Sequence, residues 1–265
     1  MPDDVAPLAH EPDPAVGAWL GPRLGRFGAT VTGLVTRGFA AYARVLHRLE
    51  RLGPGDDEWY PARWADAAAV HGTVLHPRAQ LWRVLRLGEP WSRQGDWSAP
   101  VGQLDHEQLP ALLDVLSAHT TDGPGAEVVA ALWEGFGWVD GRGVVTVTLS
   151  PDGVTRAPLE PAFAPPVLAA PRLVLPHRAY LLFRGPLGGV LPWCRTGEQG
   201  YWKQTPNLLW PTDRTWCVAT EIDLDSTVVG GPRGLVDAIC AHPDLEAFEV
   251  GEDDSFMVDG DVVDV

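Results

Sequence analysis

One run, residues 215–225 (TWCVATEIDLD), constrains the fold of this chain more than any other. Its residues alternate in character, and a period of two predicts a β-strand with one face against a core. The three carboxylates on the other face repel one another and need water, a cation or a basic partner. The buried face would carry Trp216, Val218, Thr220, Ile222 and Leu224, and the other face Cys217, Ala219, Glu221, Asp223 and Asp225.

The composition is that of a folded protein. With 265 residues, 45% of them hydrophobic, and twelve tryptophans, the chain can bury the core of one large domain or two smaller ones. No apolar run approaches the roughly 18 to 20 residues of a membrane span. The first residues lack the basic and apolar regions of a secretory signal. We therefore expect a cytoplasmic protein that does not bind membranes.

Charge is distributed unevenly along the chain. Residues 221–265 contain thirteen aspartates and glutamates and one arginine, so they carry −12 of the total net charge of −15. Binding of nucleic acid phosphates needs a basic patch, so this distribution argues against a nucleic-acid partner. It favours recognition of a basic protein partner. The oligomeric state is left open.

The motifs of metal and cofactor sites are absent from the sequence. Cys194, Cys217 and Cys240 are an odd number without a CxxC pair, and the eight histidines have no HExxH or HxH spacing. There is also no GxSxG elbow, no P-loop and no GxGxxG motif. The sequence therefore predicts no metal, no cofactor and no standard hydrolase centre.

The spacing of apolar residues predicts an α+β fold with a helical N-terminal lobe. An acidic, proline-rich loose leader (residues 1–28) precedes a helix-rich lobe at 29–150 that ends in a strand. Helices are expected at 30–52, 64–70, 77–87 and 106–118, the last with Asp105 as its N-cap. Residues 126–132 fit either a helix or a strand, and 144–149 fit a strand followed by a turn at 151–153.

A proline-rich connector and a smaller mixed α/β lobe follow. Residues 151–176 contain seven prolines, which exclude a regular helix or a central strand. They form either a linker or a loop draped over one lobe, and their apolar residues favour the draped loop. Residues 177–250 predict strands at 179–184, 215–224 and 245–250, a helix at 234–241 and a long loop at 187–211. An acidic tail, residues 251–265, ends the chain.

Three motifs carry a resemblance to known proteins: LWEGFGW (132–138), PHRAYLLFRGPL (176–187) and PNLLWPTDRTWCVATEID (206–223). The chain resembles a large family of uncharacterised proteins from GC-rich bacteria, over about residues 38–248. The resemblance implies one folded unit that spans both lobes, and it brings no activity, cofactor or catalytic residue. In its tryptophan-rich, acidic α+β character the chain is also similar to immunity proteins that neutralise bacterial toxins.

The acidic row is the first candidate site. Glu221, Asp223 and Asp225 supply the oxygen ligands that Mg²⁺ and Ca²⁺ prefer. On a strand, however, Glu221 and Asp225 are too far apart to share one ion. The other interpretation is a solvated strand face.

Two further groups flank this row. The segment 207–214, with Trp210, Asp213 and Arg214, either lines a pocket or seals the edge of the core. Arg178 and Arg184 flank the strand around residues 180–183. Arg184 could neutralise Glu221 or Asp223, or both arginines could bind an anion.

The sequence thus favours an acidic protein-binding module, of an immunity or regulatory kind, that recognises a basic partner through its C-terminal acidic surface. The alternative is an enzyme with a pocket between the lobes that uses Glu221, Asp223 and Arg184. Independently of function, the alternation predicts a buried apolar face at Trp216, Val218, Ile222 and Leu224, with Glu221 and Asp223 at least partly exposed.

Overall fold

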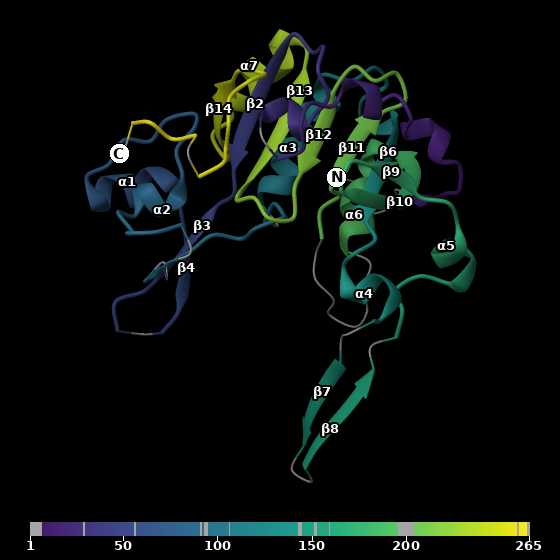
Figure 1. Cartoon of the computed structure of the whole chain (residues 1–265), viewed down its shortest axis with the longest axis horizontal. Helices are drawn as coiled ribbons and strands as arrows, with labels where there is room; N and C mark the ends of the chain where they lie inside the picture. Colours follow the sequence, from purple (N-terminus) through teal and green to yellow (C-terminus); the bar gives the residue numbers. More distant parts are fainter. Residues whose placement is uncertain are drawn as a thin grey trace.

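A large antiparallel sheet organises the protein. The computed structural model describes residues 7–28, 30–55, 57–90, 92, 95–105, 107–142, 145–150, 153–158, 160–195, 204–258 and 260–263. Within these ranges, nine strands form one sheet in the order β1-β10-β6-β11-β12-β13-β2-β14, and β9 pairs with β10 beside β1 (Figure 1). They are β1 (Ala9–Glu11), β2 (Ala41–Leu46), β6 (Glu127–Trp133), β9 (Leu173–Leu175), β10 (Arg178–Pro186), β11 (Leu208–Pro211), β12 (Cys217–Thr220), β13 (Ser226–Gly231) and β14 (Glu246–Val250).

Smaller elements surround this sheet. A second sheet has the order β4-β3-β5, and β7 pairs with β8 in a hairpin. These strands are β3 (Leu49–Leu52), β4 (Trp59–Ala62), β5 (Trp97–Ser98), β7 (Val145–Ser150) and β8 (Gly153–Pro158). The helices are α1 (Trp64–His71), α2 (Leu81–Val84), α3 (Gln108–Ala118), α4 (Gly137–Asp140), α5 (Pro165–Ala169), α6 (Val190–Arg195) and α7 (Arg233–Ala241), with short 3₁₀ turns at Pro14–Gly17, Gly21–Arg23, Val31–Gly33, Gly123–Gly125 and Leu187–Gly189. The protein is α+β, as predicted, but rich in strands.

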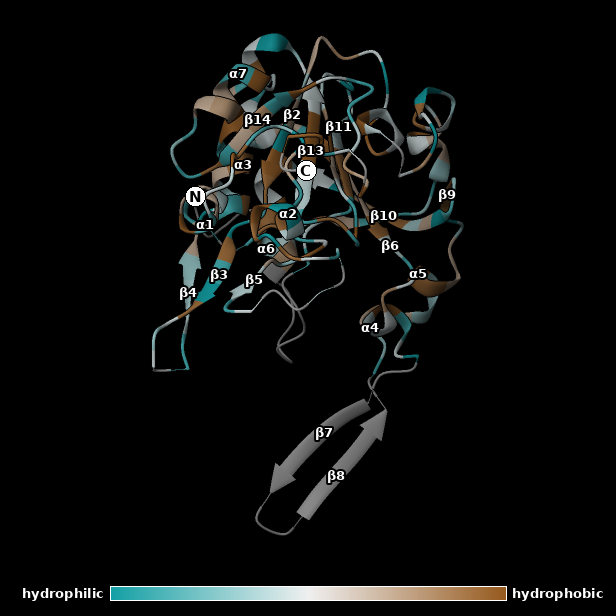
Figure 2. Ribbon diagram, turned by 60° about the vertical axis from the view of Figure 1, so that its left-hand side comes forward, coloured by the Kyte–Doolittle hydropathy of each residue, from teal (hydrophilic) through white to brown (hydrophobic). Residues whose placement is uncertain are grey.

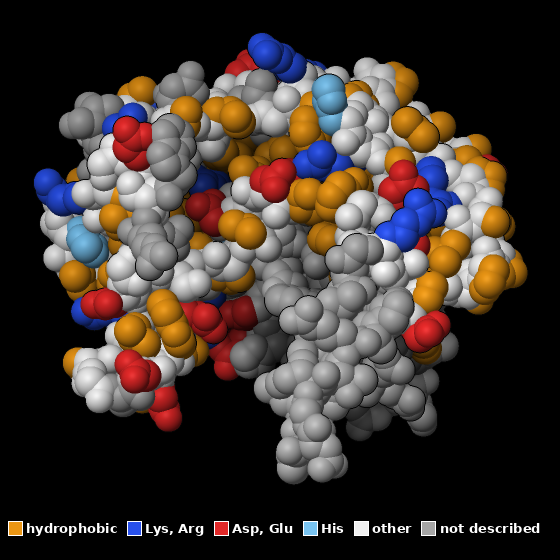
Figure 3. Space-filling view, turned by 60° about the horizontal axis from the view of Figure 1, so that its bottom comes forward, with side chains coloured by type: hydrophobic (Ala, Val, Ile, Leu, Met, Phe, Trp, Pro, Cys, Tyr) orange, Lys and Arg blue, Asp and Glu red, His pale blue; other side chains and the backbone are white. Residues whose placement is uncertain are grey.

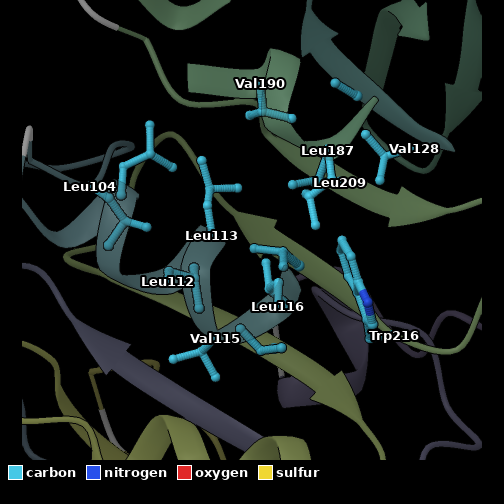
Figure 4. Packing of buried hydrophobic residues seen from close by; sticks show 14 of the residues in the cluster. Leu104, Leu112, Leu113, Val115, Leu116, Val128, Leu187, Val190, Leu209 and Trp216 are labelled. Carbon is cyan, nitrogen blue, oxygen red and sulfur yellow. The ribbon is translucent and has the colours of Figure 1, made fainter. Parts of the chain in front are cut away.

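The large sheet is buried on both faces. Helices α3, α6 and α7 cover one face, where leucines of α3 face Leu209 and Trp216 of the sheet (Figure 4). The 3₁₀ turns of residues 14–33 cover the other face with Leu20, Val31 and neighbouring residues. A third cluster lies between α1, α2 and the second sheet. Hydropathy colouring shows the apolar residues gathered on the central strands and hydrophilic residues on β3 and β4 (Figure 2).

The helix predicted at 30–52 is wrong. Residues 41–46 form β2, which pairs with β13 on one side and β14 on the other, and all six of its residues are buried. A strand that is buried on both faces has no polar alternation, so its apolar spacing imitates a helix. The Gly-Pro-Gly sequence at residues 53–55, which follows the predicted helix, is part of the loop between β3 and β4, where the Gly53 N–H donates to the Glu58 carbonyl.

The predicted acidic strand face is also wrong. Trp216 and Val218 do pack into the helix-covered core, with exposed fractions of 0% and 5%. Cys217 and Ala219, however, are equally buried in the opposite core. Strand β12 ends at Thr220, so the carboxylates lie on the turn into β13, and Ile222 and Leu224 are only half-buried.

Strand β13 was not predicted, because its serine, threonine and two glycines are typical of turns. The glycines are needed for close packing. A Cβ at Gly230 would lie 2.5 Å from the Phe39 ring, and one at Gly231 would lie 2.8 Å from Leu235. Small residues here allow the segment before β2 and helix α7 to approach the sheet from opposite sides.

The loose leader and the acidic tail are both docked on the sheet. Leu8 and Leu20 of the leader are buried, and β1 pairs with β10. In the tail, the carbonyls of Asp254 and Glu252 accept from the N–H groups of Val31 and Thr32 at 2.9 and 3.2 Å. Backbone hydrogen bonds therefore fix the tail to the segment that directly follows the leader.

The division into two lobes is not confirmed, because β6 and β2 from the first predicted lobe pair with strands of the second. The helices at 64–70, 106–118 and 234–241 are confirmed as α1, α3 and α7, and residues 126–132 form a strand. The 77–87 helix is one turn long, and the 187–211 loop contains α6 and β11. The proline-rich connector holds β8, α5 and β9, while part of the predicted turn at 151–153 lies outside the described residues.

No helix in the described ranges has the length and apolar character to cross a bilayer.

Candidate functional site

The turn between β12 and β13 brings Glu221, Asp223 and Asp225 together at one end of the sheet. The turn is closed by the Leu224 N–H, which donates to the Glu221 carbonyl at 3.1 Å. Arg178, at the start of β10, reaches this turn across β6 and β11, the two strands that lie between β10 and β12. Its Nη2 donates to Glu221 Oε1 at 2.5 Å and to Asp223 Oδ2 at 3.2 Å, so one guanidinium bridges two carboxylates.

The two carboxylates bridged by Arg178 differ in their surroundings. The side chain of Glu221 is 12% exposed, whereas that of Asp223 is 76% exposed. Burial raises the pKa of Glu221, and the hydrogen bonds and charge of Arg178 oppose this increase. Arg178 also lies over the rings of Phe27 and Trp133, at 5.0 and 5.2 Å from their centroids. The arginine is therefore held by both ionic and aromatic contacts.

Asp225 faces inward, toward the buried Arg44 of β2. Arg44 Nη2 donates to Asp225 Oδ1 at 3.2 Å, and the arginine side chain is 1% exposed. Its other donors are satisfied by the Ser226 hydroxyl and the carbonyls of Pro77 and Ala79. Burial lowers the pKa of Arg44, and Asp225 counteracts this by favouring the charged form. Asp225 is thus a structural counter-ion for a buried cation.

A cavity of about 390 Å³ opens beside this turn. We call it the turn pocket. Its apolar wall has half-exposed side chains at Val101, Met257 and Val258, with exposed fractions of 56%, 46% and 48%. Figure 3 looks onto this end of the molecule, where hydrophobic, acidic and basic side chains lie side by side. The lining is Phe27, Gly28, Thr30, Leu34, Gln80, Pro90, Val101, Arg178, Glu221, Asp223, Leu224, Asp225, Phe256, Met257 and Val258.

Both ends of the described chain build this pocket. Phe256 packs over the Arg44 guanidinium at 4.4 Å, and its carbonyl accepts from Gln80 Nε2 at 2.7 Å. Farther along, the buried Asp261 accepts from the Gln80 N–H at 3.2 Å and lies 3.0 Å from His76 Nε2. These contacts anchor Phe256 and Asp261, on either side of Met257 and Val258, to the rest of the fold.

Most of the described acids in residues 221–265 have a hydrogen-bond or ion-pair partner within the chain. Glu246 accepts from the N–H groups of Trp64 and Ala65, at 2.7 and 2.9 Å, and so caps α1. Glu252 accepts from the Tyr42 hydroxyl at 2.9 Å, and Glu249 pairs with Arg233. The acidic stretch of residues 221–265 therefore offers less free negative charge than its sequence indicates.

Arg184 is not part of the turn pocket. Its guanidinium pairs with Glu11 Oε2 at 3.2 Å and Glu127 Oε2 at 2.7 Å, on the strands that flank β10. The prediction that Arg184 neutralises Glu221 or Asp223 is therefore wrong. Arg178, six residues earlier on the same strand, makes those contacts instead.

The predicted site around residues 207–214 lies at the other end of β12. Trp210 is 1% exposed and packs edge-on against Trp19, so it seals a core. Asp213 accepts from the Thr215 N–H and hydroxyl, and Arg214 lies over the Trp19 ring at 5.5 Å. These side chains stabilise the connection between β11 and β12.

Sequence reasoning missed the apolar wall of the pocket. Phe27 lies in the predicted leader, and Phe256, Met257 and Val258 lie in the predicted tail. The available signal was the apolar triplet FMV (256–258), one residue after the acidic run EDD (252–254). Among the described residues, no three His, Cys, Asp or Glu side chains form a group able to hold a metal ion.

Comparison with protein-family models, with curated proteins and with solved structures finds no match to this chain. The geometry of the turn pocket is therefore the basis for assigning a function.

Proposed function

We propose that this chain is a protein-binding module that docks a basic, partly apolar segment of a partner protein in the turn pocket. The observation that carries the proposal is that surplus negative charge and half-exposed apolar side chains share one cavity. The charge attracts a basic segment and orients it. The apolar wall contributes free energy by losing contact with water.

The charge surplus can be assigned to particular residues. Three of the described lining residues are acidic (Glu221, Asp223 and Asp225), and Arg178 is the basic one. Arg44 lies behind Asp225 and compensates its charge from inside the fold. The part of the C-terminal acidic surface that faces the pocket is therefore the part most suited to a basic partner.

Fluorescence anisotropy with a labelled peptide of alternating leucine and arginine tests this proposal. The peptide should bind, and the same peptide with glutamate in place of arginine should not. Raising salt from about 50 to about 500 mM should weaken binding, because the Debye length falls from about 14 to about 4 Å. Asp223→Asn should weaken binding. Asp253→Asn is the control and should not, because Asp253 is 83% exposed and pairs with Arg37 outside the pocket. Equal binding by both variants would contradict the proposal.

An enzyme is the second candidate, and the raised pKa of Glu221 in a pocket favours it. Since Arg184 is held by Glu11 and Glu127, the catalytic set would be Glu221, Asp223 and Arg178. Turnover of a small molecule by the wild-type chain that is lost in Glu221→Gln would support the enzyme over the binding module.

A further inference from the structure

We infer that the basic group taken by the turn pocket is the guanidinium of a single arginine, flanked by apolar residues of the partner segment. This inference rests on the proposed function and names the chemistry of its ligand. The number of cations follows from the pocket's charges, and their kind follows from the side chains that line it.

One cation is enough to balance the pocket. Asp225 is compensated by the buried Arg44, and Glu221 accepts from both Nε and Nη2 of Arg178. The remaining carboxylate, Asp223, shares Nη2 of Arg178 and is otherwise turned to solvent, with 76% of its side chain exposed. The surplus is therefore equivalent to one negative charge, at the rim of the pocket.

The lining favours a guanidinium over an ammonium. Phe27 and Phe256 both line the pocket, and each already packs against an arginine of this chain that also binds a turn carboxylate. A planar, weakly hydrated guanidinium suits aromatic and carboxylate surroundings, whereas the lysine ammonium is more strongly hydrated and loses more on leaving water. The three methylenes of an arginine would lie along the apolar wall at Met257 and Val258.

Isothermal titration calorimetry with three peptides tests the inference. They are acetyl-Leu-Arg-Leu-amide, the same peptide with lysine, and the same peptide with citrulline, which keeps the shape of arginine but has no charge. The arginine peptide should bind most tightly, the lysine peptide several-fold more weakly, and the citrulline peptide without measurable heat. Asp223→Asn should remove the preference of arginine over citrulline, and Asp253→Asn should preserve it.

The outcomes separate the inference from the proposed function. If arginine and lysine peptides bind equally and both depend on Asp223, the proposed binding of a basic partner is supported and the preference for arginine is wrong. If citrulline binds as well as arginine, the pocket does not recognise charge and the inference fails. If no basic peptide binds, including the longer leucine–arginine peptide, both fail. Melting curves of the two variants check that each is folded, as expected for substitutions at exposed acids.

Discussion

Two regions of this protein are rich in aspartate and glutamate but have different surroundings. The turn after β12 carries Glu221 and Asp223 at the edge of an open pocket. In the C-terminal segment, by contrast, Glu246 caps a helix and Glu252 binds Tyr42. The first region keeps a carboxylate that is mostly exposed, while in the second Glu246 and Glu252 help to hold the fold together. The density of acids in a sequence therefore does not locate a binding surface, because each acid must first be assigned its partner in the fold.

Asp225 and Asp223 provide the sharpest test of this difference, because they are two residues apart on the same turn. Asp225→Ala leaves the charge of the buried Arg44 without its carboxylate partner. We expect a loss of about 3 kcal/mol in the free energy of unfolding. Asp223→Ala should change it by less than about 0.5 kcal/mol. Urea denaturation of both variants measures the difference, and similar losses would mean that both acids are structural.

The buried side chain of His47 gives a pH-dependent test of the fold. His47 Nδ1 lies 2.9 Å from the Pro100 carbonyl, and Nε2 lies 3.0 Å from the Thr227 hydroxyl. Because a carbonyl can only accept, Nδ1 carries the proton and Nε2 accepts from Thr227. Burial lowers the pKa of His47 to about 4, from 6.5.

Between these two pKa values the unfolded chain binds a proton at His47 and the folded chain does not. Stability should therefore fall as pH decreases from about 6.5 to about 4, by about 3 kcal/mol from this residue. Urea denaturation across this pH range measures the effect. His47→Gln removes the titrating group, so its unfolding free energy should depend less steeply on pH than that of wild type. Parallel pH profiles would show that His47 is not buried as a neutral side chain.

Glu246 tests the structural use of the C-terminal acids. Glu246→Ala removes the acceptor for the first N–H groups of α1, and we expect a loss of about 1 kcal/mol. Asp244→Ala is the matched control, because this neighbouring acid is exposed. Equal melting temperatures for the two variants would indicate that the cap contributes little to stability.

Part of the fold follows directly from the sequence. The helices α1, α3 and α7 were predicted because each has one face against the core and one in solvent. The alternation of β12 identified a strand, but not that both of its faces are buried. Strand β2 was misassigned for the same reason. Strand β13 was missed because its glycines are typical of turns, whereas in the fold they allow close contacts with Phe39 and Leu235. Burial on both faces depends on elements distant in the sequence, which local periodicity does not report.

The candidate site was predictable to a similar extent. Glu221, Asp223 and Asp225 were identified from their spacing, and Arg178 was recognised as a flanking cation. Phe27 and Phe256 were not, since they are more than 200 residues apart in the sequence. They come to the same pocket only because the segments that contain them pair through Val31 and Asp254. Pairing between segments so distant has no local signature.

The smallest expected effect concerns the apolar rim. Met257 and Val258 are about half exposed, so Val258→Ser should change the unfolding free energy by less than about 0.5 kcal/mol. The same change should weaken binding of the leucine–arginine peptide, because it removes apolar surface that the peptide would cover. Val263→Ser is the matched control, as this valine is 50% exposed but does not line the pocket. Anisotropy titrations in which Val258→Ser and Val263→Ser bind like wild type would leave Asp223 as the recognition element and remove the apolar wall from the site.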